Sequence, residues 1–149
     1  MLRIAIQAKG RLNEDTMALL ADAGIDVTAS KRKLVAKAAG FPLEVLYLRD
    51  DDIPQAVAMG VADVGIVGRN GVAGRRQDVR VVMPLGFGAC RISLAVPRDA
   101  GYSGLDWFDG KRVATSYPHV LHDFFTQHGV KAEIHEIAGS VEIAPAVGL

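Results

Sequence analysis

Short apolar runs of strand length alternate with stretches that carry helix signals along this chain of 149 residues. The runs at residues 2–6 and 43–48 are each followed by such a stretch, and the alternation resumes between residues 112 and 146. This order is typical of βαβ units, in which a helix crosses over between two parallel strands. The sequence therefore predicts an α/β fold with mainly parallel strands.

The element boundaries follow from local signals. Strands are expected at residues 2–6, 43–48, 64–67, 79–83, 91–96, 112–114 and 132–137, and helices from residue 12 to Gly24, from about Asp52 to Met59, at 118–127 and from 141. Asn13 is expected to cap the first of these helices, and Asp52 has capping-box spacing to Gln55. Gly86 and Gly88 separate two strand-like runs. We therefore expect two lobes, at residues 1–88 and 89–149.

Composition narrows the class of protein. Lys and Arg together number 17, as do Asp and Glu, so the net charge is zero, and half of the residues are apolar. A dedicated nucleic-acid-binding protein needs a basic face, and a membrane span needs about 20 apolar residues. The sequence indicates neither. The single cysteine, Cys90, and a start without secretory-signal character predict a cytoplasmic protein.

Polar side chains gather at corners between the expected elements. The stretches are Lys9-Gly10-Arg11, Ser30-Lys31-Arg32-Lys33, Arg49-Asp50-Asp51-Asp52, Thr115-Ser116-Tyr117-Pro118 and Gly139-Ser140-Val141-Glu142. In open α/β sheets, corners at the carboxyl ends of strands line the ligand site. Taken singly, each stretch is also typical of solvated charge or of a helix cap. The three aspartates would suit Mg²⁺, although we prefer a capping role for Asp52.

In their order along the chain, these stretches resemble the motifs of ATP phosphoribosyltransferases, which catalyse the first step of histidine biosynthesis. The resemblance also includes Gly60-Val61-Ala62-Asp63-Val64-Gly65-Ile66-Val67-Gly68, Phe87-Gly88-Ala89-Cys90-Arg91 and the final residues Glu142 to Leu149. It implies two α/β lobes that face a cleft, as in type II periplasmic binding proteins. It also implies transfer of phosphoribosyl from phosphoribosyl pyrophosphate to N1 of ATP, with release of pyrophosphate and with Mg²⁺ as cofactor.

The resemblance assigns roles to residues of this chain. Arg11 and Arg32 match arginines that would grip the departing pyrophosphate, and they are the expected catalytic residues. The expected substrate-binding residues are Lys9, Gly10 and Arg49 on the anionic side, and Ser116, Tyr117 and Glu142 on the ATP or ribose side. No protein ligand to a metal is expected.

The resemblance also has a limit. In the family, the run at Glu142 continues into a Thr-Gly-x-Thr loop that holds the 5-phosphate, whereas this sequence stops at Leu149. We therefore expect an incomplete second lobe and a chain that is inactive by itself. Asp50-Asp51-Asp52 and the region of His119 look more like the long form of the family, which is regulated by its own C-terminal domain. The short form instead recruits a regulatory subunit that resembles histidyl-tRNA synthetase, and a homo-oligomer is expected.

Two other functions stay open at this point. One is a ligand-binding or effector-sensing module of the type II binding-protein class, which would bind without catalysis. The other is a fragment that has no function or serves only in assembly.

Overall fold

The structure is a computed structural model that describes residues 1–28 and 34–149. It divides into two compact units, Met1–Cys90 and Arg91–Leu149. The division lies two residues beyond the boundary that we expected after residue 88.

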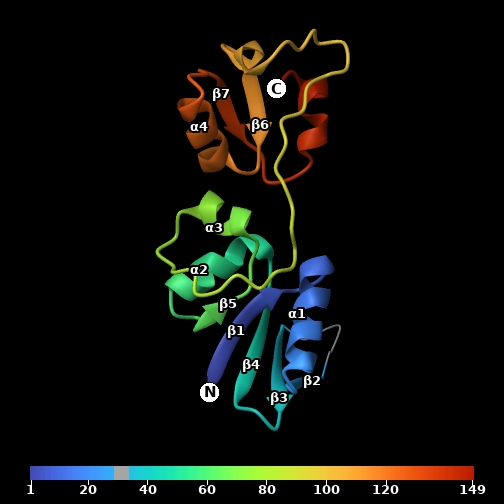
Figure 1. Ribbon diagram of the computed structural model, residues 1–149, viewed down its shortest axis with the longest axis vertical. Helices are drawn as coiled ribbons and strands as arrows, with labels where there is room; N and C mark the ends of the chain where they lie inside the picture. Colours follow the sequence, from blue (N-terminus) through green and yellow to red (C-terminus); the bar gives the residue numbers. More distant parts are fainter. Residues whose placement is uncertain (29–33) are drawn as a thin grey trace. The chain divides into compact units, whose positions relative to one another are not determined.

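The first unit is built on a five-stranded sheet with the order β2-β3-β4-β1-β5 (Figure 1). Its central strand β1 (Leu2–Gln7) runs parallel to β4 (Leu43–Leu48) over its whole length and parallel to β5 (Val64–Gly65). Two further strands extend the sheet with antiparallel pairing, β3 (Val35–Ala39) on β4 and β2 (Asp26–Val27) on β3. The sheet is therefore mixed, with its parallel part at β4, β1 and β5.

Helices cover both faces of this sheet (Figure 1). Helix α1 (Arg11–Asp22) follows β1, the short turn η1 (Asp50–Asp52) and α2 (Ile53–Ala58) follow β4, and α3 (Arg69–Arg75) follows β5. Alternate residues of the strands supply two cores. One joins Ile4, Ile6 and Val45 to Leu20 of α1, and the other joins Ala5 and Leu46 to Ile53 of α2.

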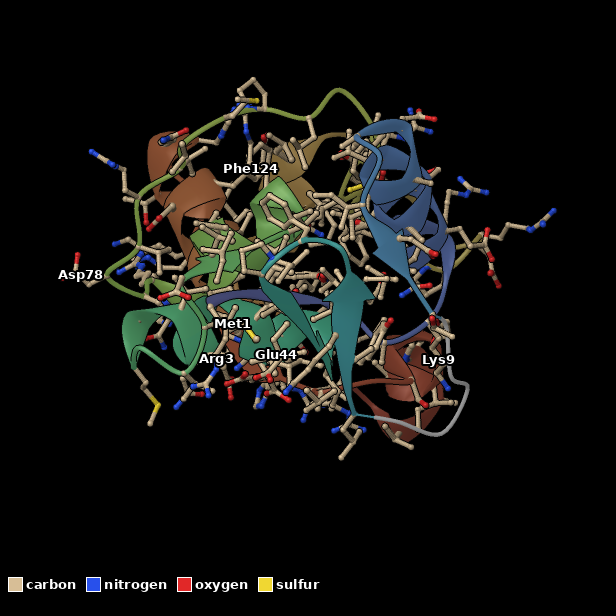
Figure 2. The ribbon with its side chains drawn as sticks, turned by 90° about the horizontal axis from the view of Figure 1, so that it is seen from below. Met1, Arg3, Lys9, Glu44, Asp78 and Phe124 are labelled. Atoms are coloured by element: carbon tan, nitrogen blue, oxygen red, sulfur yellow. The ribbon has the colours of Figure 1, made fainter. Side chains whose placement is uncertain are left out.

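The register of β1 and β4 is also visible at the surface. Arg3 is the cross-strand partner of Glu44, and its Nε lies 3.1 Å from Glu44 Oε1 (Figure 2). The backbone N–H of Arg3 donates to Asp63 Oδ2 at 2.7 Å, which ties the residue before β5 to β1. These contacts fix the amino ends of the parallel strands, so that their carboxyl ends meet at the opposite edge.

The second unit contains the parallel strands β6 (Arg112–Thr115) and β7 (Glu133–Glu136), joined by helix α4 (Pro118–Gln127) (Figure 1). The 3₁₀ turns η2 (Leu105–Phe108) and η3 (Val141–Val147) flank them. Its core contains Phe108, Leu121, Phe125 and Val130, and the rings of Phe108 and Phe125 lie 5.6 Å apart. This unit therefore has a core of its own.

The α/β class and most elements agree with the sequence prediction, but several elements do not. Residues 79–83 and 91–96 form no strand, and β5 is limited to Val64–Gly65. A strand needs a hydrogen-bonded neighbour, and the described residues supply none to either segment. Val81, Val82 and Met83 accordingly remain 65%, 76% and 67% exposed. The helix expected from residue 141 is the 3₁₀ turn η3, which has Pro145 inside it, a residue without an N–H to donate.

Strands β2 and β3 and helix α3 were not predicted from the sequence. Strand β3 reads Val-Ala-Lys-Ala-Ala, which has little strand propensity, and it forms because β4 offers it an edge. Strand β2 then pairs with β3. Helix α3 contains Gly71 and Gly74, which weaken a helix in isolation, but both are buried in the folded unit. In each case tertiary contacts override local propensity.

No helix in the described part of the chain has the length and apolar character that a membrane crossing requires.

Candidate functional site at the carboxyl ends of the parallel strands

The first corner follows β1 and carries two of the predicted cations. Ala8 N–H donates to Leu48 O at 2.8 Å, which extends the pairing of β1 and β4 by one residue. Gly10 then has φ 96°, a backbone conformation that residues with a side chain rarely adopt, and α1 begins at Arg11. Lys9 and Arg11 are both exposed on either side of this turn. The glycine therefore lets the chain turn sharply between two solvent-facing cations.

Asn13 holds this corner in a way that the sequence did not reveal. Its Nδ2 donates to Gln7 O at 2.8 Å, whereas Gly10 occupies the N-cap position of α1 without a side-chain cap bond. The prediction that Asn13 caps the helix is therefore wrong. The side chain instead satisfies the last carbonyl of β1, where the chain leaves the sheet.

The second corner follows β4. Arg49 is extended and exposed, and Asp52 N–H donates to Arg49 O at 3.0 Å to close the turn η1. Asp52 makes no side-chain cap bond, so the predicted capping box is absent. Its backbone has helical angles because η1 leads directly into α2. An N-cap residue needs extended angles to aim its side chain at the first free N–H groups, which explains the difference.

Asp50 and Asp51 both contact the segment after β5, at Gly68 and in helix α3 respectively. Asp50 is half-buried, and the pKa of its carboxyl is raised, mainly because burial disfavours the charged form. The charge of the nearby Asp51 raises this pKa further, whereas a hydrogen bond from the backbone of Gly68 lowers it. Asp51 Oδ2 lies 3.2 Å from Arg75 Nη2, and both of these side chains are largely exposed. The two neighbouring aspartates thus connect the corner after β4 to helix α3.

The third corner follows β5, and the sequence prediction assigned no site residue to it. Ile66 N–H donates to Ala5 O at 2.9 Å, and α3 begins directly after Gly68. A Cβ on Gly71 would lie 3.0 Å from Val67 Cγ2 and 3.6 Å from Asp50 Oδ2. The glycines of the Gly60 to Gly68 motif could have indicated a close contact here, since glycine permits close approach of two backbone segments. The sequence alone did not show that Asp50 is the neighbour.

The second unit has a corresponding pair of corners. Ser116 Oγ donates to Ile137 O at 2.6 Å, which joins the chain after β6 to the chain after β7. Tyr117 N–H donates to Thr115 Oγ1 at 3.0 Å just before α4 begins at Pro118. Glu142 is exposed in the turn η3. The two ends are therefore adjacent, as expected for parallel strands.

The predicted site residues thus fall into two groups. Lys9, Gly10, Arg11 and Arg49 lie at the carboxyl edge of β1 and β4 in the first unit. Ser116, Tyr117 and Glu142 follow β6 and β7 in the second. Arg32, the other predicted catalytic residue, lies outside the described residues.

The chemistry of the first group suits an anion. Among residues 1–28 and 34–149, no acidic side chain pairs with Lys9, Arg11 or Arg49, although all three are exposed near one sheet edge. Cationic side chains beside a glycine turn are typical of phosphate contacts.

A protein-built metal site is not seen in the same region. The described residues include no cluster of three or more His, Cys, Asp or Glu side chains that would hold a metal ion. Asp50 and Asp51 are engaged by Gly68 and Arg75, so they do not converge on a common point.

Comparison with known proteins agrees with the resemblance seen in the sequence. A family model described as ATP phosphoribosyltransferase matches residues 49–149. A protein of Bacteroides fragilis with that name is 58% identical over all 149 residues, and one of Phocaeicola vulgatus is 57% identical. A more distant relative in Cytophaga hutchinsonii, also named ATP phosphoribosyltransferase, is 49% identical. The chain spans about half the length of these curated relatives, 52–53%.

A solved structure shows the same fold. The ATP phosphoribosyl transferase (HisG:HisZ) complex from Thermotoga maritima includes a chain that is 29% identical, with a TM-score of 0.77. The match covers 99% of this chain and 69% of that one. The fold is therefore of the α/β, type II periplasmic-binding-protein-like kind found in that enzyme. The family model and the relatives that match the whole chain together show that it belongs to the ATP phosphoribosyltransferase family.

Proposed function

We propose that this chain carries part of the active site for transfer of phosphoribosyl from phosphoribosyl pyrophosphate to N1 of ATP, the first step of histidine biosynthesis. The observation that supports this most directly is the group of exposed cations Lys9, Arg11 and Arg49 at one sheet edge, in a chain of this family. The products are phosphoribosyl-ATP and pyrophosphate. The reaction needs no activated side-chain nucleophile, because the attacking atom belongs to ATP.

The reaction explains why cations are needed. The lone pair of adenine N1 forms a bond to ribose C1, while the bond from C1 to the pyrophosphate oxygen breaks. The electron pair leaves with pyrophosphate, so negative charge grows on that group in the transition state. Fixed cations aimed at this charge stabilise the transition state more than the bound substrate. We assign this role to Arg11 and, from the family resemblance, to Arg32.

The other predicted residues take supporting roles in this proposal. Lys9 and Arg49 hold the phosphate groups, and Gly10 lets the backbone approach them. Tyr117 and Glu142 face the ATP or ribose side, while the Ser116 hydroxyl holds the corner through Ile137 and retains lone pairs that accept a hydrogen bond. Mg²⁺ would be carried by the substrate phosphates, where it neutralises charge, and no step is assigned to it.

Partners and location follow the family. We propose that the protein works in the cytoplasm as an assembly of several copies. The solved relative is a complex of two kinds of subunit, HisG and HisZ. A regulatory partner of that kind is proposed for this chain if its full form lacks a regulatory domain of its own.

The test is release of pyrophosphate that depends on both ATP and phosphoribosyl pyrophosphate. Arg11→Ala is expected to lower turnover about 100-fold or more, while the affinity for ATP changes only a few-fold, because the contact is made mainly to developing charge. Lys37→Ala is the matched control, since Lys37 is exposed and pairs in register with Glu44, near the opposite end of β4. It should leave both quantities unchanged.

Two results would contradict the proposal. If the protein, tested alone and together with the remaining half found in its relatives, binds ATP but releases no pyrophosphate, a binding or sensing module is the better description. If Arg11→Ala lowers ATP affinity and turnover equally, Arg11 acts in ground-state binding and not on the departing charge.

A further inference from the structure

Asp50 belongs to the corner after β4, and its carboxylate packs against the first turn of α3. It accepts a hydrogen bond from the backbone N–H of Gly68, and its Oδ2 lies 3.6 Å from the position of a Cβ on Gly71. Its Oδ1 is buried and has no hydrogen-bond partner among the described residues. The side chain thus fills the space between two corners that are distant in sequence.

The close packing around α3 shows that this space is limited. Gly71 is buried, and a Cβ there would already crowd Val67 at 3.0 Å. A Cβ on Gly68 would lie 2.5 Å from Asn70 Oδ1, and one on Gly65 would lie 2.5 Å from Ile53 Cγ2. At Gly65 and Gly71 these contacts leave little room for a larger side chain, whereas at Gly68 the contact is with the movable end of the Asn70 side chain. The position of this segment is set by the groups that it touches, and Asp50 is one of them.

The neighbouring ion pair has a different character. Asp51 and Arg75 lie 3.2 Å apart, but their side chains are 49% and 44% exposed. Solvent screens such a pair, and exposed pairs contribute little to stability. The contact from Asp50 to Gly68 is more shielded because the carboxylate is half-buried. Of the two links between η1 and α3, that of Asp50 is the one that fixes a backbone position.

We propose that Asp50 is a positioning residue for this site: its carboxylate holds the Gly68 to Gly71 segment beside Arg49, so that the corners after β4 and β5 contact one phosphate-bearing substrate together. The inference rests on the proposed function, because it needs an anionic ligand at the carboxyl edge of the sheet. It adds a residue that touches no substrate and acts through its neighbours.

The cost of placing the carboxylate there supports a role beyond stability. Burial and the charge of Asp51 both raise the pKa of Asp50, which makes its ionised form less favourable in the folded protein. Groups held at such a cost are concentrated at functional sites.

Substitutions separate the positioning role from general damage. Asp50→Ala removes the acceptor for Gly68 N–H. With the chain joined to the remaining half found in its relatives, this variant should raise the KM for ATP about tenfold, with a smaller change in kcat. Asp50→Asn keeps a carbonyl oxygen in the same place and should restore most of the affinity. Asp51→Asn, which disturbs only the exposed pair with Arg75, is the matched control and should stay within about twofold of the wild type. Equal KM values for Asp50→Ala and the wild type would overturn the proposal.

A second measurement needs no variant and no substrate. Amide hydrogen exchange of the wild-type chain should show that Gly68 N–H is protected, in contrast to the N–H of exposed Gly101. The protection should persist in Asp50→Asn and be lost in Asp50→Ala, if that variant folds. Exchange of Gly68 as fast as that of Gly101 in the wild type would overturn the proposal.

The two measurements also distinguish failure of this inference from failure of the proposed function. If the wild type binds neither ATP nor phosphoribosyl pyrophosphate, the proposed function fails, and the positioning role fails with it. The exchange experiment would then report only whether Asp50 holds α3. If the wild type turns over normally but Gly68 is unprotected, the function stands and the role of Asp50 is wrong.

Discussion

Asn13 shows how one side chain controls the exit from a strand. Its amide donates to Gln7 O at 2.8 Å, on the corner that carries Lys9 and Arg11. The bond satisfies the carbonyl of the last residue of β1, and it ties this corner to the first turn of α1. A side chain that accepted a hydrogen bond at the helix start would do neither.

This difference gives a direct test at Asn13. Asn13→Asp has almost the same shape but cannot donate a hydrogen bond, so we expect a loss of about 1 kcal/mol in unfolding free energy, as for a typical hydrogen bond. Urea denaturation of the two proteins measures it. If Asn13 were a helix cap, Asp would replace it without loss, because Asp caps equally well. Unchanged stability would therefore contradict the structure.

Asp50 predicts how stability depends on pH. Because the pKa of this carboxyl is raised in the folded protein, the folded state binds its proton more tightly than the unfolded state does. This group therefore makes stability fall as pH rises from the unfolded pKa near 3.8 through the higher folded pKa. Asp50→Asn should remove this contribution. Denaturation curves between about pH 3.5 and 7 should then show a flatter or upward trend for the variant relative to the wild type. An identical difference in stability at every pH would contradict the assignment.

Among the elements, the two strands of the second unit are joined at their carboxyl ends by a side chain. Ser116 Oγ donates to Ile137 O at 2.6 Å beyond the last paired residues Thr115 and Glu136. This bond continues the contact between the strands where the backbone ladder stops. It also fixes the segment that leads into α4.

We expect Ser116→Ala to lower the unfolding free energy by about 1 kcal/mol, because one partly buried hydrogen bond is lost. Ser103→Ala, at an exposed position, is the control and should have no measurable effect. Thermal unfolding of both variants measures the difference. Equal melting temperatures for the two variants would show that the Ser116 bond contributes nothing.

For the whole molecule, each unit has its own core. Phe125 is 2% exposed and packs with Phe108 and Leu121, all from the second unit. Ile53 is fully buried with Ala5 and Leu46 in the first. Substitutions in one core should therefore affect mainly the unit that contains it.

Phe125→Ala should destabilise its unit by about 3 to 5 kcal/mol, the usual cost of removing a buried aromatic ring. Amide hydrogen exchange should accelerate within Arg91–Leu149 and remain near the wild-type rate within Met1–Cys90. Ile53→Ala, expected to cost about 2 to 5 kcal/mol, should give the opposite pattern. Uniform acceleration over both units by either variant would show that they unfold as one.

The elements that could be predicted carry their signals within their own residues. Residues 118–127 form α4 as expected, because Pro118 suits a first helical position and Leu121 and Phe125 recur at helical spacing. Residues 43–48 form β4 as expected, since the run is apolar and of strand length. The corners with Lys9, Gly10, Arg11 and Arg49 could be placed because each directly follows such a strand.

The rest depended on contacts between segments distant in sequence. Strand β3 exists because β4 has a free edge, and residues 79–83 form no strand because none of the described residues pairs with them. Asn13 and Asp52 both looked like caps, but Asn13 lies inside α1 and donates to Gln7 O, and Asp52 has helical backbone angles and makes no cap bond. The neighbours of Asp50 are at Gly68 and Gly71, a distance along the chain that no local pattern bridges.

The sequence by itself thus determined the α/β class, the main strands and helices, the family and the cations at the first two corners, because hydrophobic period, turn residues and motif order are all local properties of the chain. The tertiary structure decided which strands pair, which polar groups satisfy which backbone atoms, and that Asp50 joins two corners. These pairings and contacts depend on which strand edges and polar groups remain without a partner after the local elements form. Free edges and unsatisfied N–H and carbonyl groups are costly to bury, so the fold matches them with partners that are distant in sequence, as Gly68 is from Asp50.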